Sequence, residues 1–89
     1  MYMYNNCRYE AHWIGIDGFD VLLGGSPNMD EAEQIAIEQA AQLLESPFMD
    51  MDEKLKVIET LYLCDKKDNT EISTETLDAY IDNVIAQYR

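Results

Sequence analysis

The sequence predicts a single α+β domain, in which an N-terminal antiparallel β-hairpin of two or three strands is followed by three α-helices. Three observations predict it: an Asp-Gly pair between two alternating apolar segments, three capping residues that each precede a helical apolar stripe, and an apolar content of 47%. That apolar content distinguishes the chain from disordered acidic segments. With 89 residues it can form one modest core, so we expect one domain over residues 1–89.

A β-hairpin is predicted over about residues 7–24, because Asp17-Gly18 favours a two-residue turn in which both central residues adopt positive φ. Such a turn would pair Ile14 with Val21 and His12 with Leu23, and alternation on both sides of it assigns the side chains to two faces. The face expected to join the core carries Ile14, Ile16, Phe19, Val21 and Leu23. The face expected to be a candidate contact surface carries Tyr9, Ala11, Trp13, Asp20 and Leu22. The segment Met1 to Tyr4 also alternates and is a candidate for a short third strand or for the start of a longer first strand.

Three helices are predicted after the Gly24-Gly25 break, each from a capping residue and an apolar stripe of helical period. Their approximate ranges and capping residues are 28–45 with Asn28 and Glu31, 51–65 with Asp50 and Glu53, and 73–88 with Ser73. The polar segment from Asp65 to Glu71 is expected to link the second helix to the third.

The charge is strongly negative and unevenly distributed. The chain has 18 Asp and Glu against 6 Lys and Arg, which gives a formal net charge of -12. Between Arg8 and Lys54 lie 45 residues without a single cation, and they include eleven acids. Because affinity for nucleic acid depends on Lys and Arg at the phosphates, we expect no direct DNA or RNA binding. A basic protein is the expected partner, with simple solubility as the alternative role of the acids.

No residue pattern indicates catalysis, a cofactor or a metal. His12 is the only histidine, and Cys7 and Cys64 stand in unrelated contexts, so neither a zinc site nor a disulfide framework is expected. The segment from Asp65 fails the calcium-loop pattern, since Thr76 stands where the bidentate Glu belongs. We therefore expect a protein that is not an enzyme and that uses no cofactor or metal.

The residues Gly24-Gly25-Ser26, Asp30 to Glu33 and Ala36 to Ala41 are loosely similar to the strand-to-helix junction of double-stranded-RNA-binding domains. The similarity covers about twenty residues. That family needs basic residues at the start of the helix to contact phosphates, whereas this sequence has Asp30 and Glu31 there. RNA binding is therefore not expected from this similarity.

In size, charge and architecture the chain resembles the small acidic inhibitors that bacteriophages and mobile elements encode against host defence. These include anti-CRISPR and anti-restriction proteins, and bacterial immunity proteins that block nuclease toxins are similar in character. The resemblance implies a stoichiometric inhibitor whose carboxylates replace phosphates in a groove lined by Lys and Arg. It also implies a soluble protein, monomeric or homodimeric, in the cytoplasm of a bacterial host, in keeping with a sequence that has no membrane-length apolar run and no signal peptide at its start.

The residues expected to contact the partner are acids of the cation-free segment together with two aromatic anchors: Asp17, Asp20, Asp30, Glu31, Glu33, Glu38, Glu45, Tyr9 and Trp13. A different class of function remains open, namely a small adaptor or homo-oligomeric protein that binds through an apolar face of Tyr9, Trp13 and Leu22. The two aromatic residues could equally belong to the core.

Overall fold

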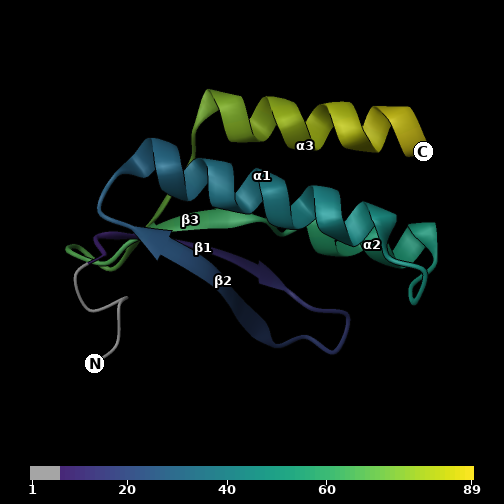
Figure 1. Ribbon diagram of the computed structural model, residues 1–89, viewed down its shortest axis with the longest axis horizontal. Coiled ribbons are helices and arrows are strands. Elements are labelled where there is room, and N and C mark those ends of the chain that lie inside the picture. The colour runs from purple at the N-terminus through teal and green to yellow at the C-terminus, as the bar shows by residue number, and fades with distance from the viewer. Residues whose placement is uncertain (1–6) are drawn as a thin grey trace.

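The computed structural model describes residues 7–89 and confirms the α+β class, but the order of the elements differs from the predicted one (Figure 1). The elements are β1 (Tyr9–Ile14), β2 (Asp20–Ser26), α1 (Met29–Glu45), α2 (Met51–Glu59), β3 (Tyr62–Asp65), β4 (Thr70–Ile72) and α3 (Glu75–Tyr88). Two further strands therefore lie between the second and third helices. The candidate strand at residues 1–4 is outside the described residues.

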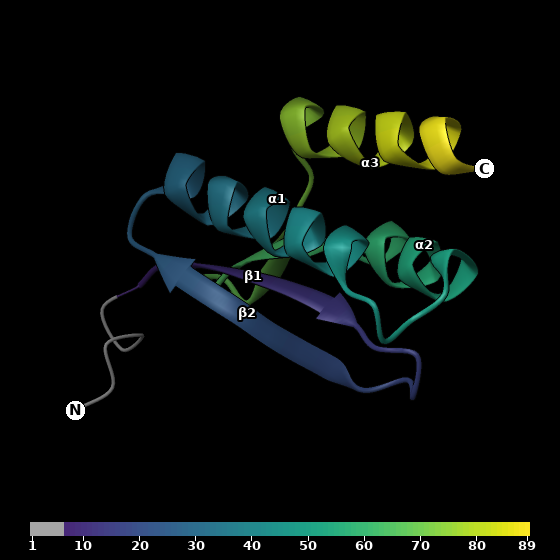
Figure 2. The same ribbon diagram turned by 45° about the vertical axis from the view of Figure 1, so that its right-hand side comes forward.

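The four strands form one antiparallel sheet in the order β2-β1-β3-β4. Helix α1 lies across β1 and β2, and α3 packs against α1 and α2. Figures 1 and 2 show the helices on the same side of the sheet. No helix of residues 7–89 covers the other side, which we call the open sheet face. Within residues 7–89, no helix is both long enough and apolar enough to cross a membrane.

The core lies between the sheet and the helices. Its centre is formed by the buried residues Ala11, Ala32, Ala36, Ala40, Leu55, Ile58, Leu61, Leu63, Leu77 and Val84. The three alanines lie one turn apart on α1 and let this helix approach the sheet closely. The approach is equally close at Gly24, where an added Cβ would lie 3.0 Å from Cγ2 of Ile35.

The hairpin turn is longer than predicted, and the predicted register is wrong. Strand β1 ends at Ile14 and β2 begins at Asp20, so Ile14 pairs with Asp20 instead of Val21. The loop over residues 15–19 is closed by hydrogen bonds from the Gly15 N–H to the Phe19 carbonyl and from the Gly18 N–H to the Gly15 carbonyl, each 2.9 Å. Within this loop, only Gly18 has a positive φ, of 87°. A two-residue turn would need two such residues.

The predicted face assignment is consequently wrong for β1 and for the loop. On β2, however, Leu23 packs against the core as predicted, and Val21 lies beside Trp13 on the core side. Ala11 is fully buried under the helices, whereas Ile16 and Phe19 are 59% and 71% exposed. A β-bulge changes the register again, because Ala11 pairs with Gly24 while His12 pairs with Leu22. His12 was expected opposite Leu23, which is the extra residue in the bulge. A shift of one residue moves every side chain to the other face.

The second helix is shorter than the predicted range of 51–65, because α2 ends at Glu59. Thr60 forms its C-cap: the Thr60 hydroxyl donates to the Val57 carbonyl at 2.6 Å and accepts from the Ile14 N–H at 2.8 Å. The chain then enters β3. The expected polar link is the turn between β3 and β4, with Asn69 at a φ of 56°.

The helix starts agree closely with the capping patterns. Asn28 is the N-cap of α1, although its side chain accepts from the Asp30 N–H and forms no reciprocal box. The Asp50 and Glu53 capping box of α2 is present in full. The N-cap of α3 is Thr74, one residue later than the predicted Ser73.

Candidate functional site

The solvent face of α1 carries a row of carboxylates that we call the acidic stripe: Asp30, Glu31, Glu38 and Glu45. All four are exposed. Glu31, Glu38 and Glu45 are seven residues apart, which returns each side chain to within about 20° of the previous one and separates neighbours by about 10 Å along the axis. Asp30 lies beside the first of them. The alanines on the opposite side of α1 hold this face outward.

Glu33 was predicted to contact the partner, but it faces another part of the protein. It is half-buried, and one carboxylate oxygen accepts a hydrogen bond from the Thr74 hydroxyl at the start of α3. Glu31 also has an internal partner, since it accepts from the Ser26 hydroxyl at 3.0 Å, although it remains exposed. Glu33 therefore connects α1 to the start of α3 by a hydrogen bond and is not part of the acidic stripe.

No cation in residues 7–89 forms an ion pair with the acidic stripe. Four of the six cations have partners elsewhere: Arg8 with Asp65, Lys66 with Glu10, Arg89 with Glu59, and Lys54 with the Leu44 carbonyl. The Lys54 ammonium is buried and lies 2.8 Å from that carbonyl at the end of α1. Within the described part of the chain, the negative charge of the stripe is therefore not neutralised by an ion pair.

The structure places Asp17 and Asp20 on other elements than the helix that carries the stripe. Asp17 is in the exposed loop between β1 and β2, where its carboxylate accepts from the Phe19 N–H at 3.1 Å. Asp20 is on the open sheet face, because its carboxylate contacts His12, whose neighbour Ala11 is buried on the helix side. The predicted set of acids is thus divided among a helix face, a loop and the open sheet face.

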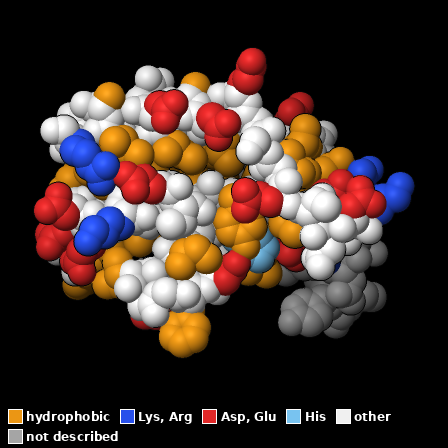
Figure 3. Space-filling model, turned by 180° about the vertical axis from the view of Figure 1, so that it is seen from behind, with side chains coloured by type: hydrophobic (Ala, Val, Ile, Leu, Met, Phe, Trp, Pro, Cys, Tyr) orange, Lys and Arg blue, Asp and Glu red, His pale blue; other side chains and the backbone are white. Residues whose placement is uncertain are grey.

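On the open sheet face, four residues form what we call the His12 network: Glu10, His12, Asp20 and Tyr62. Nδ1 of His12 lies 2.7 Å from Asp20, and Nε2 lies 3.1 Å from Glu10. The His12 ring stacks on Tyr62 with centroids 5.2 Å apart, and the Tyr62 hydroxyl donates to Asp20. Figure 3 shows the histidine reaching the surface among acidic and apolar side chains.

Hydrogen bonds dominate the electrostatics of this network. Both ring nitrogens of His12 face carboxylates. Partial desolvation raises the pKa of Asp20, but the hydrogen bonds from Tyr62 and His12 outweigh it and hold the pKa below its ordinary value. Desolvation and the nearby Glu10 raise the pKa of the Cys64 thiol, so it stays protonated at neutral pH. Within residues 7–89 no group of acids, His and Cys is arranged to hold a metal.

Tyr9 and Trp13 are half-buried and pack against the core. Arg8 lies over the Tyr9 ring, 5.1 Å from its centroid. Leu22 is 44% exposed and shares the open sheet face with His12, its partner across the hairpin. The apolar surface predicted from Tyr9, Trp13 and Leu22 is therefore not a single face.

The hairpin tip carries exposed apolar residues that were predicted to join the core, namely Ile16, Phe19 and Val21. A further exposed apolar residue, Phe48, is 91% exposed and lies in the loop between α1 and α2. The signal that could have located it is Gly15, because a glycine before Ile16-Asp17-Gly18 permits a longer loop.

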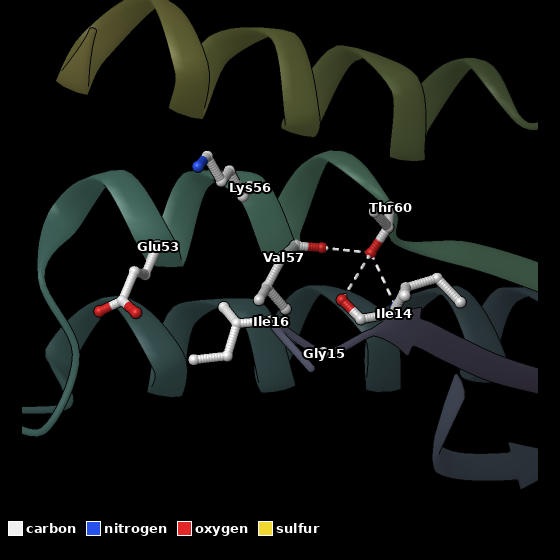
Figure 4. A pocket seen from close by; sticks show the side chains of 7 residues that line it. All are labelled: Ile14, Gly15, Ile16, Glu53, Lys56, Val57 and Thr60. Carbon is white, nitrogen blue, oxygen red and sulfur yellow. Dashed lines mark hydrogen bonds between the residues drawn. The ribbon is translucent and has the colours of Figure 1, made fainter. Parts of the chain in front are cut away.

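Two hollows flank the loop over residues 15–19. One, of about 420 Å³, lies between this loop and α2 (Figure 4). There the Ile16 side chain lies next to Val57, and Thr60 contacts Ile14. The second, of about 210 Å³, we call the hairpin-tip hollow, and it is lined by Trp13, Gly15, Ile16, Asp17, Val21, Leu43, Met49 and Val57.

Comparison of the chain with protein-family models, with curated protein sequences and with solved structures finds no match. Function is therefore inferred from the arrangement of residues alone.

Proposed function

We propose that this protein is a stoichiometric inhibitor of a basic nucleic-acid-handling protein, and that the acidic stripe of α1 occupies the groove in which that protein binds phosphates. The observation that carries the proposal is the row of Glu31, Glu38 and Glu45 on one exposed helix face, to which no cation of residues 7–89 is paired. A host-defence nuclease or CRISPR effector complex in a bacterial cytoplasm is the class of target with such a groove.

The stripe suits this role physically. Its carboxylates are separated by about 10 Å along the helix, close to the Debye length in physiological salt, so each one can meet a separate Lys or Arg. The helix is held by a buried alanine face, so little backbone entropy is lost on binding. The unneutralised charge would accelerate association with a basic surface, and this rate would fall as salt increases.

The proposal is tested by affinity capture from a nuclease-treated bacterial lysate at low and high salt, with the captured proteins identified by mass spectrometry. The informative variant is Glu31→Lys, Glu38→Lys and Glu45→Lys together. The matched control is Glu75→Lys, Asp78→Lys and Asp82→Lys on α3, which changes the net charge by the same amount on another exposed helix face.

We expect capture of one basic nucleic-acid-binding protein by the wild type and by the α3 control, with loss in high salt and in the α1 variant. Circular dichroism checks that all three proteins are folded. Equal loss of capture in both variants would mean that binding depends on the total charge and not on the stripe. Unchanged capture by the α1 variant would contradict the proposal.

A second candidate is an adaptor whose contacts are mainly apolar, and the exposed Ile16, Phe19 and Phe48 favour it. It predicts capture that persists at about 0.5 M salt, where the Debye length is only a few Å. Phe19→Ser would then abolish capture, and the α1 charge reversal would not.

A further inference from the structure

The hairpin-tip hollow has the size and lining of a site for one side chain. Its volume of about 210 Å³ is below the range of roughly 300–1,000 Å³ that is usual for small-molecule pockets. Its walls are apolar except for Asp17, the only charged residue that lines it. The half-buried Trp13 and the buried Val57 contribute to it from the core side.

The surroundings of the hollow restrict its occupant. Asp17 is exposed and has no cation paired to it within residues 7–89, and Asp50 directly follows the lining residue Met49. Glu53 and Lys56 both line the adjoining hollow on the α2 side. An incoming segment therefore meets more carboxylates than ammonium groups around the hollow. A second copy of this chain would bring another net charge of -12 to the same place, which opposes self-association.

We propose that the hairpin-tip hollow binds a large apolar side chain of a protein partner, and that this side chain is flanked by Lys or Arg. The inference rests on the proposed function, because it places the anchor on the same basic partner that the acidic stripe contacts. A desolvated apolar anchor within a charged rim is the usual arrangement of a binding hot spot.

The hollow adjoins one end of the stripe. Leu43, which lines the hollow, is two residues before Glu45, and the last turn of α1 contains no basic residue. Figures 1 and 2 place the hairpin loop and the loop between α1 and α2 at this same end of the molecule. A partner bound along the stripe would therefore have its apolar anchor close to the C-terminal end of α1.

The test uses two peptide probes with the full-length, isotope-labelled protein in NMR titrations. The probes are N-acetyl-Arg-Trp-Arg-amide and N-acetyl-Arg-Gly-Arg-amide, which share their charge and differ in the apolar side chain. The Trp peptide is expected to produce saturable shifts at the amides of Gly15, Ile16, Val21 and Met49, and the Gly peptide is not. The same shifts with both peptides, or shifts spread over every acidic surface, would overturn the proposal.

Two substitutions locate the binding. Ile16→Ser removes a wall of the hollow at a 59% exposed position, and the affinity for the Trp peptide is expected to fall at least about fivefold. Phe48→Ser is the control, because Phe48 is 91% exposed and does not line the hollow. An equal loss in both variants would overturn the proposal.

Two further readouts complete the test. A dimer in light scattering that Ile16→Ser dissociates would contradict the proposal, because the occupant would be a second copy. In the α1 charge-reversal variant, the Trp peptide should still shift the amide signals at the hollow, because the stripe does not line it. Failure of the proposed function and failure of this inference are therefore distinguishable.

Discussion

Asp65 joins the start of β1 to the end of β3. Its carboxylate accepts two hydrogen bonds from the Arg8 guanidinium, at 3.1 and 2.9 Å, and one from the Lys67 N–H at 3.0 Å. The hydrogen bonds from Arg8 hold the pKa of Asp65 below its ordinary value, and the Lys67 N–H adds to this effect. A bidentate pair of this kind is stronger than an ordinary surface ion pair.

This geometry predicts a pH-dependent contribution to stability. Because the pKa of Asp65 is lower in the folded state than the unfolded value of 3.8, its contribution is present above that pH and is lost as the pH falls through the folded-state pKa. Asp65→Asn should therefore be less stable than the wild type at pH 7, and the difference should shrink below pH 3.8. Urea unfolding from pH 7 to 2.5 measures it, and a difference independent of pH would contradict this assignment.

Lys54 is a second residue whose role follows from its contacts. Its side chain is buried, and the ammonium donates to the Leu44 carbonyl at the end of α1. Lys54→Met keeps most of the apolar stem but leaves this carbonyl without its donor, so the free energy of unfolding should fall by about 1–3 kcal/mol. Lys56→Met, at an exposed position on the same helix, should change it little. Urea unfolding of both variants tests the difference, and equal effects would refute a specific role for Lys54.

At the scale of elements, the close packing of α1 on the sheet depends on its alanine face. Ala36 is fully buried, whereas Ala41 is exposed on the same helix. Ala36→Leu should therefore overpack the interface and lower the free energy of unfolding by about 1–3 kcal/mol. Ala41→Leu adds the same atoms to the solvent face and should be close to neutral. Chemical denaturation of the pair measures this contrast, and a neutral Ala36→Leu would mean that α1 does not pack closely.

The sequence predicts the helix starts well, because capping is a local interaction. Asp50 and Glu53 bond to each other's backbone within four residues, and the N-cap of α1 at Asn28 is similarly local. The acidic face of α1 was likewise predictable, since helical period alone assigns it.

The strands β3 and β4 and the hairpin register depend on partners distant in sequence. Leu61 and Leu63 are both buried. The sequence of this segment alone did not distinguish the end of a helix from a strand. Its pairing with β1, in which Leu63 lies opposite Ala11, makes it a strand. The register of the hairpin depends on a loop closed by Gly15 and Phe19 and on a bulge at Leu23. A shift of one residue there exchanged the core face and the solvent face of β1, so the sequence did not predict the hairpin-tip hollow beside Trp13.

For the molecule as a whole, the excess of carboxylates predicts a salt dependence of stability. The net charge of -12 produces repulsion within a compact fold, and salt screens this repulsion more than it weakens the few ion pairs. Raising sodium chloride from about 0.02 to 0.5 M should therefore raise Tm in thermal unfolding. The α3 charge-reversal variant, with half the net charge, should show a smaller increase. A Tm that falls with salt would indicate that ion pairs dominate.

The stripe itself is tested most directly by competition for nucleic acid. A fluorescent oligonucleotide is bound to the captured basic partner, and its displacement is followed by anisotropy as this protein is added. The account predicts displacement that is complete near one equivalent for the wild type and for the α3 charge-reversal control, and strongly weakened for the Glu31, Glu38 and Glu45 reversal. Oligonucleotide that stays bound while this protein also binds the partner would contradict phosphate replacement by α1.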